Sequence, residues 1–126
     1  VLHAHADDEA LEILFGHNSK AKIIWAHTGF GTPLDKLSRY LERYPQLWGE
    51  LSYRYGISEG GKLSAEWKAL LLKYPDRFLV GSDTWVDERW ARYGALMGEY
   101  RGWLAQLPRD VAEKIAFRNA ERLFGK

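Results

Sequence analysis

The feature that most constrains the fold of this chain is a regular alternation of short apolar stretches with longer amphipathic ones. The apolar, strand-like stretches are residues 1–5, 22–27, 47–54 and 78–83, and each is followed by a segment with the apolar spacing of a helix. Alternation at this interval is typical of βαβ units, in which the strands are parallel. The sequence therefore predicts an α/β fold of parallel βα repeats, with one extra helix at the C-terminal end.

Polar residues and proline mark where several of the predicted helices begin. Asp7 or Asp8 can cap the first helix, Pro33 suits the first turn of the second, and Ser64 begins the third. The glycine-rich residues 55–63 are predicted to form a loop before that third helix.

The composition limits the kinds of partner that this chain can have. Its 126 residues are 46% apolar, which suits one core and not two ordinary domains, so residues 1–126 are interpreted as a single domain. The formal net charge is +1, and therefore nothing favours nucleic acid as a partner. No apolar run reaches the roughly 18 residues of a membrane span. The absence of cysteine excludes disulfides and thiolate metal sites but leaves the compartment open, with the cytoplasm favoured.

Polar side chains lie near the end of each predicted strand. His5, His27, Ser52 and Asp83 follow one another at intervals of 22, 25 and 31 positions, about one βα repeat each. Right-handed crossovers bring all four strand ends to one edge of the sheet. That edge is where both barrels and open α/β sheets bind their ligands. His3 lies one pleat deeper than His5 on the same predicted face and is the alternative to it.

Two imidazoles and a carboxylate on one edge suit two kinds of chemistry. They are ordinary ligands of a divalent metal such as zinc, and manganese or iron accepts the same donors. The same groups can transfer protons, because imidazole titrates near neutrality and a nearby cation keeps a carboxylate ionised. The sequence therefore predicts a metal-binding or proton-transferring site at this edge.

Four stretches occur in a characteristic order along the chain: KIIWAHTGFG, LWGELSYR, DRFLVGSDTW and IAFRNAERLFG. Together they resemble the amidohydrolase superfamily, and the amidohydrolase-2 group in particular, over essentially the whole chain. That group contains metal-dependent hydrolases and related decarboxylases built on a (β/α)8 TIM barrel. The resemblance implies that this chain is the C-terminal half of such a barrel, strands 5–8.

The resemblance also implies a role for each polar residue at the strand ends. His5 matches the fifth-strand histidine, a metal ligand, with His3 as the second choice. His27 matches the sixth-strand histidine, which is a metal ligand in hydrolases and an acid–base or electrophilic group in decarboxylases. Asp83 matches the eighth-strand aspartate, a metal ligand and general base.

Further residues are candidates for contact with substrate. Ser52 and Arg54 lie at the end of the seventh strand, where Arg54 can pair with a substrate carboxylate or form a structural ion pair. Trp85 and Trp25 can form a wall of the pocket, although packing between sheet and helices is preferred for Trp25. His17 is interpreted as a solvated turn residue.

The family's first strand carries a His-x-His pair, and residues 3–5 could supply it. Only three strands follow, however, so the fifth strand is the preferred assignment and the first four βα units are expected to be absent. A half-barrel has two unpaired sheet edges. The missing N-terminal half or a second copy of the chain is therefore expected to cover them.

These observations favour an enzyme that acts on a small molecule. The leading hypothesis is a metal-dependent hydrolase that attacks a carbonyl, ester or amide carbon, with Asp83 and His27 as catalytic residues. The alternatives are a decarboxylase of the same group and a catalytically incomplete half-barrel.

Overall fold

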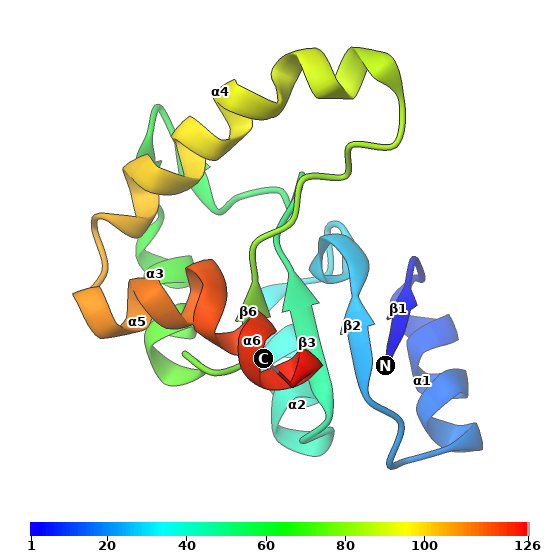
Figure 1. Ribbon diagram of the computed structural model, residues 1–126. Coiled ribbons are helices and arrows are strands. Elements are labelled where there is room, and N and C mark those ends of the chain that lie inside the picture. Colours follow the sequence, from blue (N-terminus) through cyan, green and yellow to red (C-terminus); the bar gives the residue numbers. More distant parts are fainter. Residues whose placement is uncertain (126) are drawn as a thin grey trace.

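Four parallel strands form the sheet at the centre of the molecule, which we describe from a computed structural model of residues 1–125 (Figure 1). The strands lie in the spatial order β1-β2-β3-β6, so each new strand is added beside the preceding one. This sequential order is that of a barrel wall, whereas a doubly wound sheet reverses direction at a switch point. The predicted parallel α/β architecture is confirmed, and it is consistent with part of a TIM-type barrel. The strands are β1 (Leu2–Ala4), β2 (Ile23–Trp25), β3 (Leu47–Glu50) and β6 (Phe78–Leu79).

Helices connect the strands and complete the C-terminal part of the chain. The predicted first cap is present, because the Asp7 carboxylate accepts the backbone N–H of Ala10 at 2.8 Å. Ser64 likewise accepts the N–H of Trp67 at 3.2 Å. The helices are α1 (Asp8–His17), α2 (Leu34–Arg43), α3 (Ala65–Lys73), α4 (Asp87–Leu104), α5 (Arg109–Glu113) and α6 (Asn119–Phe124), with a π-helical turn (Lys114–Arg118) joining the last two. No helix among residues 1–125 combines the length and the apolar character that crossing a bilayer requires.

The glycine-rich segment before α3 contains a small hairpin, so the prediction of a plain loop was wrong there. Strands β4 (Ser58–Glu59) and β5 (Lys62–Leu63) pair in antiparallel fashion. Gly60 and Gly61 connect them with φ values of 56° and 78°. Two consecutive residues with positive φ form the tight turn that suits a two-residue hairpin, and glycine adopts it without strain.

Three of the predicted strands end earlier than the apolar pattern suggested. The sheet strands stop at Trp25, Glu50 and Leu79, and the backbone beyond them turns out of the sheet. His27 and Asp83 have φ values of 52° and 49°, which no extended strand can accommodate. His27 therefore lies in a 3₁₀ turn, residues 26–29, rather than at the end of a strand.

The two faces of the sheet have different neighbours. Trp25, Gly49 and Phe78 share a register and point toward the helices, where the main apolar core lies. The Trp25 side chain is fully buried, donates from Nε1 to the carbonyl of Ala6 at 2.7 Å and meets Tyr40 edge-on, which confirms its packing role. The alternate residues of each strand point to the opposite face of the sheet, away from the main apolar core.

The C-terminal helical segment is attached to the last sheet strand by a buried amide. Asn119 is 1% exposed, and its Nδ2 donates to the carbonyls of Pro75 and Phe78, each at 2.9 Å. A buried side-chain amide that satisfies two carbonyls fixes the path of the strand that carries them. The segment that follows Leu79, which contains Asp83, therefore leaves the sheet from a fixed position.

Candidate active site

Two adjoining cavities lie at the carboxyl ends of the sheet strands. His5, His27 and Asp83 border both of them, so the structure brings these three predicted residues into one place. The first cavity, of about 250 Å³, is lined by His3, His5, Ala26, His27, Glu50, Ser52, Gly81, Ser82 and Asp83. The second, of about 530 Å³, is lined by His5, His27, Phe30, Tyr53, Tyr55, Asp83, Trp85 and Arg89.

His27 is held in one orientation at the centre of this site. His27 is only 6% exposed, and its Nδ1 lies 2.7 Å from the carbonyl oxygen of Ser52. Because a carbonyl oxygen can only accept, this contact requires the hydrogen on Nδ1. In the neutral ring Nε2 then carries the free lone pair, which can bind an electrophile or accept a proton. The ring of His5 meets that of His27 edge-on, with centroids 5.2 Å apart.

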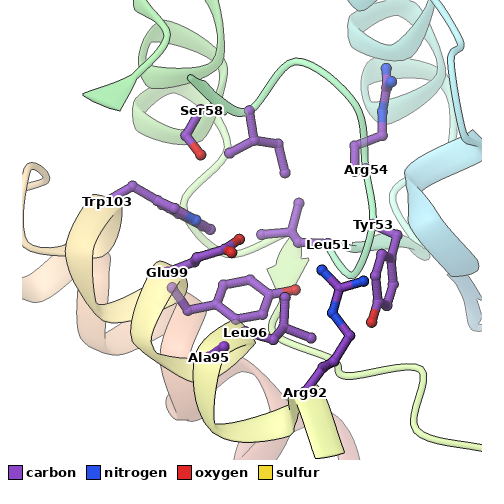
Figure 2. A pocket seen from close by; sticks show the side chains of 11 residues that line it. Leu51, Tyr53, Arg54, Ser58, Arg92, Ala95, Leu96, Glu99 and Trp103 are labelled. Atoms are coloured by element: carbon purple, nitrogen blue, oxygen red, sulfur yellow. The ribbon is translucent and has the colours of Figure 1, made fainter. Parts of the chain in front are cut away.

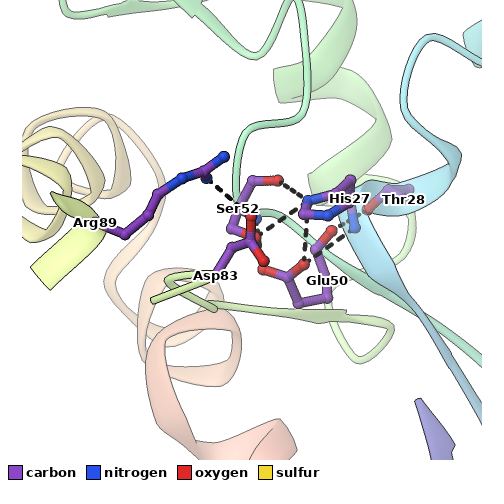
Figure 3. A network of polar contacts seen from close by, with 6 residues as sticks. All are labelled: His27, Thr28, Glu50, Ser52, Asp83 and Arg89. Atoms are coloured by element: carbon purple, nitrogen blue, oxygen red, sulfur yellow. Dashed lines mark hydrogen bonds and ion pairs between the residues drawn. The ribbon is translucent and has the colours of Figure 1, made fainter. Parts of the chain in front are cut away.

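A buried carboxylate that the sequence interpretation missed supports this arrangement (Figure 3). Glu50 is 6% exposed, and its Oε2 accepts the backbone N–H of His27 at 3.0 Å. Its Oε1 accepts the backbone N–H of Ser52 at 2.6 Å. The signal that could have revealed it is a lone acidic residue inside the apolar stretch LWGELS, since buried carboxylates occur only where they are paired or hydrogen-bonded.

Asp83 faces an arginine from the first turn of α4. Arg89 Nη1 donates to Asp83 Oδ2 at 2.8 Å (Figure 3). The guanidinium also lies 4.1 Å from the centroid of the Tyr53 ring. The sequence interpretation also missed Arg89, because only the three-dimensional fold brings the start of α4 back to the strand ends. A cation therefore already balances the charge of Asp83 in this structure.

Backbone strain is concentrated around these cavities. Within residues 1–125, the non-glycine residues with positive φ are His27, Thr28, Phe30, Tyr53 and Asp83. All of them except Thr28 line one or both of the cavities, and Thr28 follows His27 directly. Such conformations cost about 1–3 kcal/mol each and persist where the surrounding structure enforces them, most often at functional sites.

The remaining predicted residues differ in how they relate to the cavities. Ser52 is buried, and its Oγ lies 3.3 Å from His27 Nδ1. Trp85 is 74% exposed at the border of the larger cavity. Arg54 lines neither cavity, because its guanidinium donates to the backbone carbonyls of Phe30 and Thr32. Burial lowers the pKa of Arg54, and the structure gives it a role in holding these loops.

A third cavity, of about 240 Å³, lies between the loop after β3 and α4 (Figure 2). Arg92 and Tyr53 lie next to each other there, whereas the guanidinium of Arg54 points away from its centre. Tyr100, also part of the lining, is 4% exposed, and burial raises the pKa of its hydroxyl. Tyr53 lines both this cavity and the larger strand-end cavity, but none of His5, His27 and Asp83 borders the third one.

The donor set can be compared with what a divalent metal needs. Within the described residues, no three His, Asp or Glu side chains lie close enough together to form a metal site. The donor types are nevertheless suitable, since two imidazoles and a carboxylate border one cavity and the tautomer of His27 leaves Nε2 available. The residues thus fit a metal in donor type, although the side chains are not gathered into a ligand set in the part of the chain that the structure describes.

A protein-family model described as Amidohydrolase, Amidohydro_2, matches residues 1–126, the whole chain. The chain belongs to the amidohydrolase superfamily. The resemblance read from the sequence is thereby confirmed, and membership places this amidohydrolase in a superfamily of hydrolases and decarboxylases whose members commonly bind divalent metals. The comparison with curated proteins gave no match, and the comparison with solved structures gave none either.

Proposed function

We propose that this amidohydrolase is a metal-dependent hydrolase that acts on a small molecule at a carbonyl, ester or amide carbon. The observation that supports the proposal is that His5, His27 and Asp83, which follow three different sheet strands, border the same cavities. Barrel enzymes place their catalytic groups at this end of the strands and take them from several strands.

Each residue has a defined part in the proposed reaction. His5 and His27 hold the metal together with Asp83; zinc is the metal favoured by these donors, and manganese or iron is the alternative. Such a metal, when bound, lowers the pKa of a water molecule toward neutrality and polarises a carbonyl oxygen. The Asp83 carboxylate accepts the proton of the attacking water, and Arg89 forms an ion pair with this carboxylate. Trp85 and Ser52 border the space that the substrate occupies.

The position of the four strands in the barrel is part of the proposal. We assign β1, β2, β3 and β6 to strands 5–8 of the family's barrel, because the histidines and the aspartate follow them in the family's order. Among the described residues, no further strand pairs with the outer edge of β1 or of β6, and an open sheet edge can pair with another strand. We propose that the N-terminal half of the barrel or a second copy of this chain pairs with these edges, so that residues 1–126 function as part of a larger barrel.

A decarboxylase is the second candidate, and one observation favours it. Arg89 is the only arginine or lysine that borders the two strand-end cavities within the described residues. Its guanidinium lies over the ring of Tyr53, and Phe30 and Tyr55 line the same cavity. A guanidinium in such surroundings suits a carboxylated substrate, because its planar fork can bind both carboxylate oxygens. His27 would then supply the proton that replaces carbon dioxide.

Product analysis distinguishes the two reactions. We expect the full-length protein, loaded with zinc, to release alcohol or amine together with an acid from one or more members of a panel of esters and amides. Parallel incubation with aromatic and aliphatic carboxylic acids is expected to release no carbon dioxide above the metal-free control. Carbon dioxide release with no hydrolysis of the panel would instead establish the decarboxylase.

A further inference from the structure

We propose that Glu50 is a positioning residue that fixes both the backbone and the ring tautomer of His27. Any effect of Glu50 on catalysis rests on the proposed function of His27. That Glu50 positions His27 rests only on the contacts between these residues. Neither the sequence interpretation nor the family match assigns Glu50 any role.

The Glu50 carboxylate reaches both the backbone of His27 and the residue that accepts a hydrogen bond from its ring. Oε2 of Glu50 accepts the N–H of His27 at 3.0 Å, which fixes the backbone from which the ring projects. Oε1 accepts the N–H of Ser52 at 2.6 Å, and the carbonyl of Ser52 in turn lies 2.7 Å from His27 Nδ1. The carboxylate thus fixes the residue and, through Ser52, the acceptor of its ring.

Glu50 also supports a turn whose backbone is strained. His27 and Thr28 have φ values of 52° and 44°, and left-handed backbone is unfavourable for residues with a Cβ. The Glu50 carboxylate holds the first of these residues through its N–H. The backbone carbonyl of Glu50 holds the second, because it accepts a hydrogen bond from Thr28 Oγ1 at 2.7 Å. A single residue of β3 therefore supports both residues of the strained turn.

The segment that follows β6 leaves room for this carboxylate at Gly81. A Cβ at Gly81 would lie 2.1 Å from Glu50 Oε1 and 2.6 Å from Cδ, a separation that no packed structure tolerates. Gly81 lies between β6 and Asp83, so the space for the carboxylate is provided by the segment that carries the proposed general base.

These contacts predict a defined tautomer. With Nδ1–H donated to the carbonyl of Ser52, Nε2 is left with its lone pair, which is the form that binds a metal or accepts a proton. Without Glu50, the strained turn and the segment at Ser52 lose their shared support. His27 then samples other backbone and ring orientations.

The test is nitrogen NMR of the imidazole rings, at an alkaline pH where they are neutral. In the native chain we expect His27 to be predominantly the Nδ1–H tautomer. In Glu50→Gln, one amide end can still accept, but the NH₂ end cannot. The Nδ1–H fraction of His27 should therefore fall toward that of an unconstrained imidazole, and amide exchange at His27 or Ser52 should quicken about tenfold or more.

Two further variants make the result specific. Glu50→Asp keeps two acceptor oxygens on a shorter arm, so we expect the same changes at smaller size, and this variant serves as the test if Glu50→Gln does not fold. Glu12 accepts a hydrogen bond from the Tyr40 hydroxyl and borders neither strand-end cavity. Glu12→Gln should therefore leave the tautomer and the amide exchange of His27 unchanged. An unaltered His27 tautomer and amide exchange in a folded Glu50 variant would overturn the proposal, whether or not the protein hydrolyses any ester or amide.

Discussion

Asp83→Asn is expected to lower turnover about 10³-fold on whichever ester or amide the protein hydrolyses best. A positioned general base contributes about 10²–10⁴-fold, and the amide of asparagine cannot accept the proton of the attacking water. Asparagine is preferred to alanine because Asp83 has a φ of 49°, a conformation that asparagine adopts more readily. Steady-state kinetics of native and variant protein at equal zinc loading give the measurement.

The matched control for this variant is Asp87→Asn, four residues later in the first turn of α4. Asp87 is exposed and borders neither strand-end cavity. The turnover of Asp87→Asn should therefore equal that of the native protein. Thermal unfolding is expected to change little in either variant, since the Asp83–Arg89 ion pair is partly exposed and such pairs contribute little. Turnover by Asp83→Asn within a few-fold of native would exclude the general-base role.

Gly81→Ala is expected to destabilise the protein by about 3 kcal/mol. The new Cβ would lie 2.1 Å from Glu50 Oε1, so the carboxylate must leave its place. The backbone N–H groups of His27 and Ser52 then lose their acceptor, and each buried unsatisfied donor costs about 1–3 kcal/mol. Against the 5–15 kcal/mol stability of an ordinary domain this is a large loss. Chemical denaturation followed by tryptophan fluorescence measures it.

Gly94→Ala is the control for Gly81→Ala, because it is the same substitution at a position where the added Cβ meets no other atoms. A Cβ at this exposed position of α4 meets nothing within 4 Å, and alanine is the better helix former by about 1 kcal/mol. We therefore expect Gly94→Ala to be as stable as the native protein or slightly more stable. If Gly81→Ala were equally harmless, the carboxylate of Glu50 would not be held as the contacts indicate.

Much of the fold could be predicted because local signals and packing agree. The apolar stretches before His5, His27 and Asp83 are strands in the structure, and the caps at Asp7 and Ser64 begin their helices as expected. The ends of the strands were less predictable. Apolar character continues past Trp25 and Leu79, whereas the backbone beyond them turns into left-handed conformations at His27 and Asp83. These residues meet Glu50 and Arg89, respectively, only once the chain has folded.

The sequence allowed the residues that border the candidate site to be predicted, but not the residues that support them. His5, His27 and Asp83 could be found because strand-end position and residue type are both visible in one sequence. Glu50 and Arg89 could not, since their importance depends on which backbone groups and side chains they meet after folding. Arg54 illustrates the converse, because a strand-end arginine that suits a carboxylate is engaged instead with backbone carbonyls.

A calorimetric zinc titration of the metal-free protein tests the central claim most directly. We predict one zinc per chain, with an affinity that falls at least tenfold in His27→Ala and is unchanged in His17→Ala, which removes an exposed imidazole at the end of α1. Absence of zinc binding, or zinc binding that His27→Ala leaves intact, would contradict the assignment of this site as the metal centre of a hydrolase.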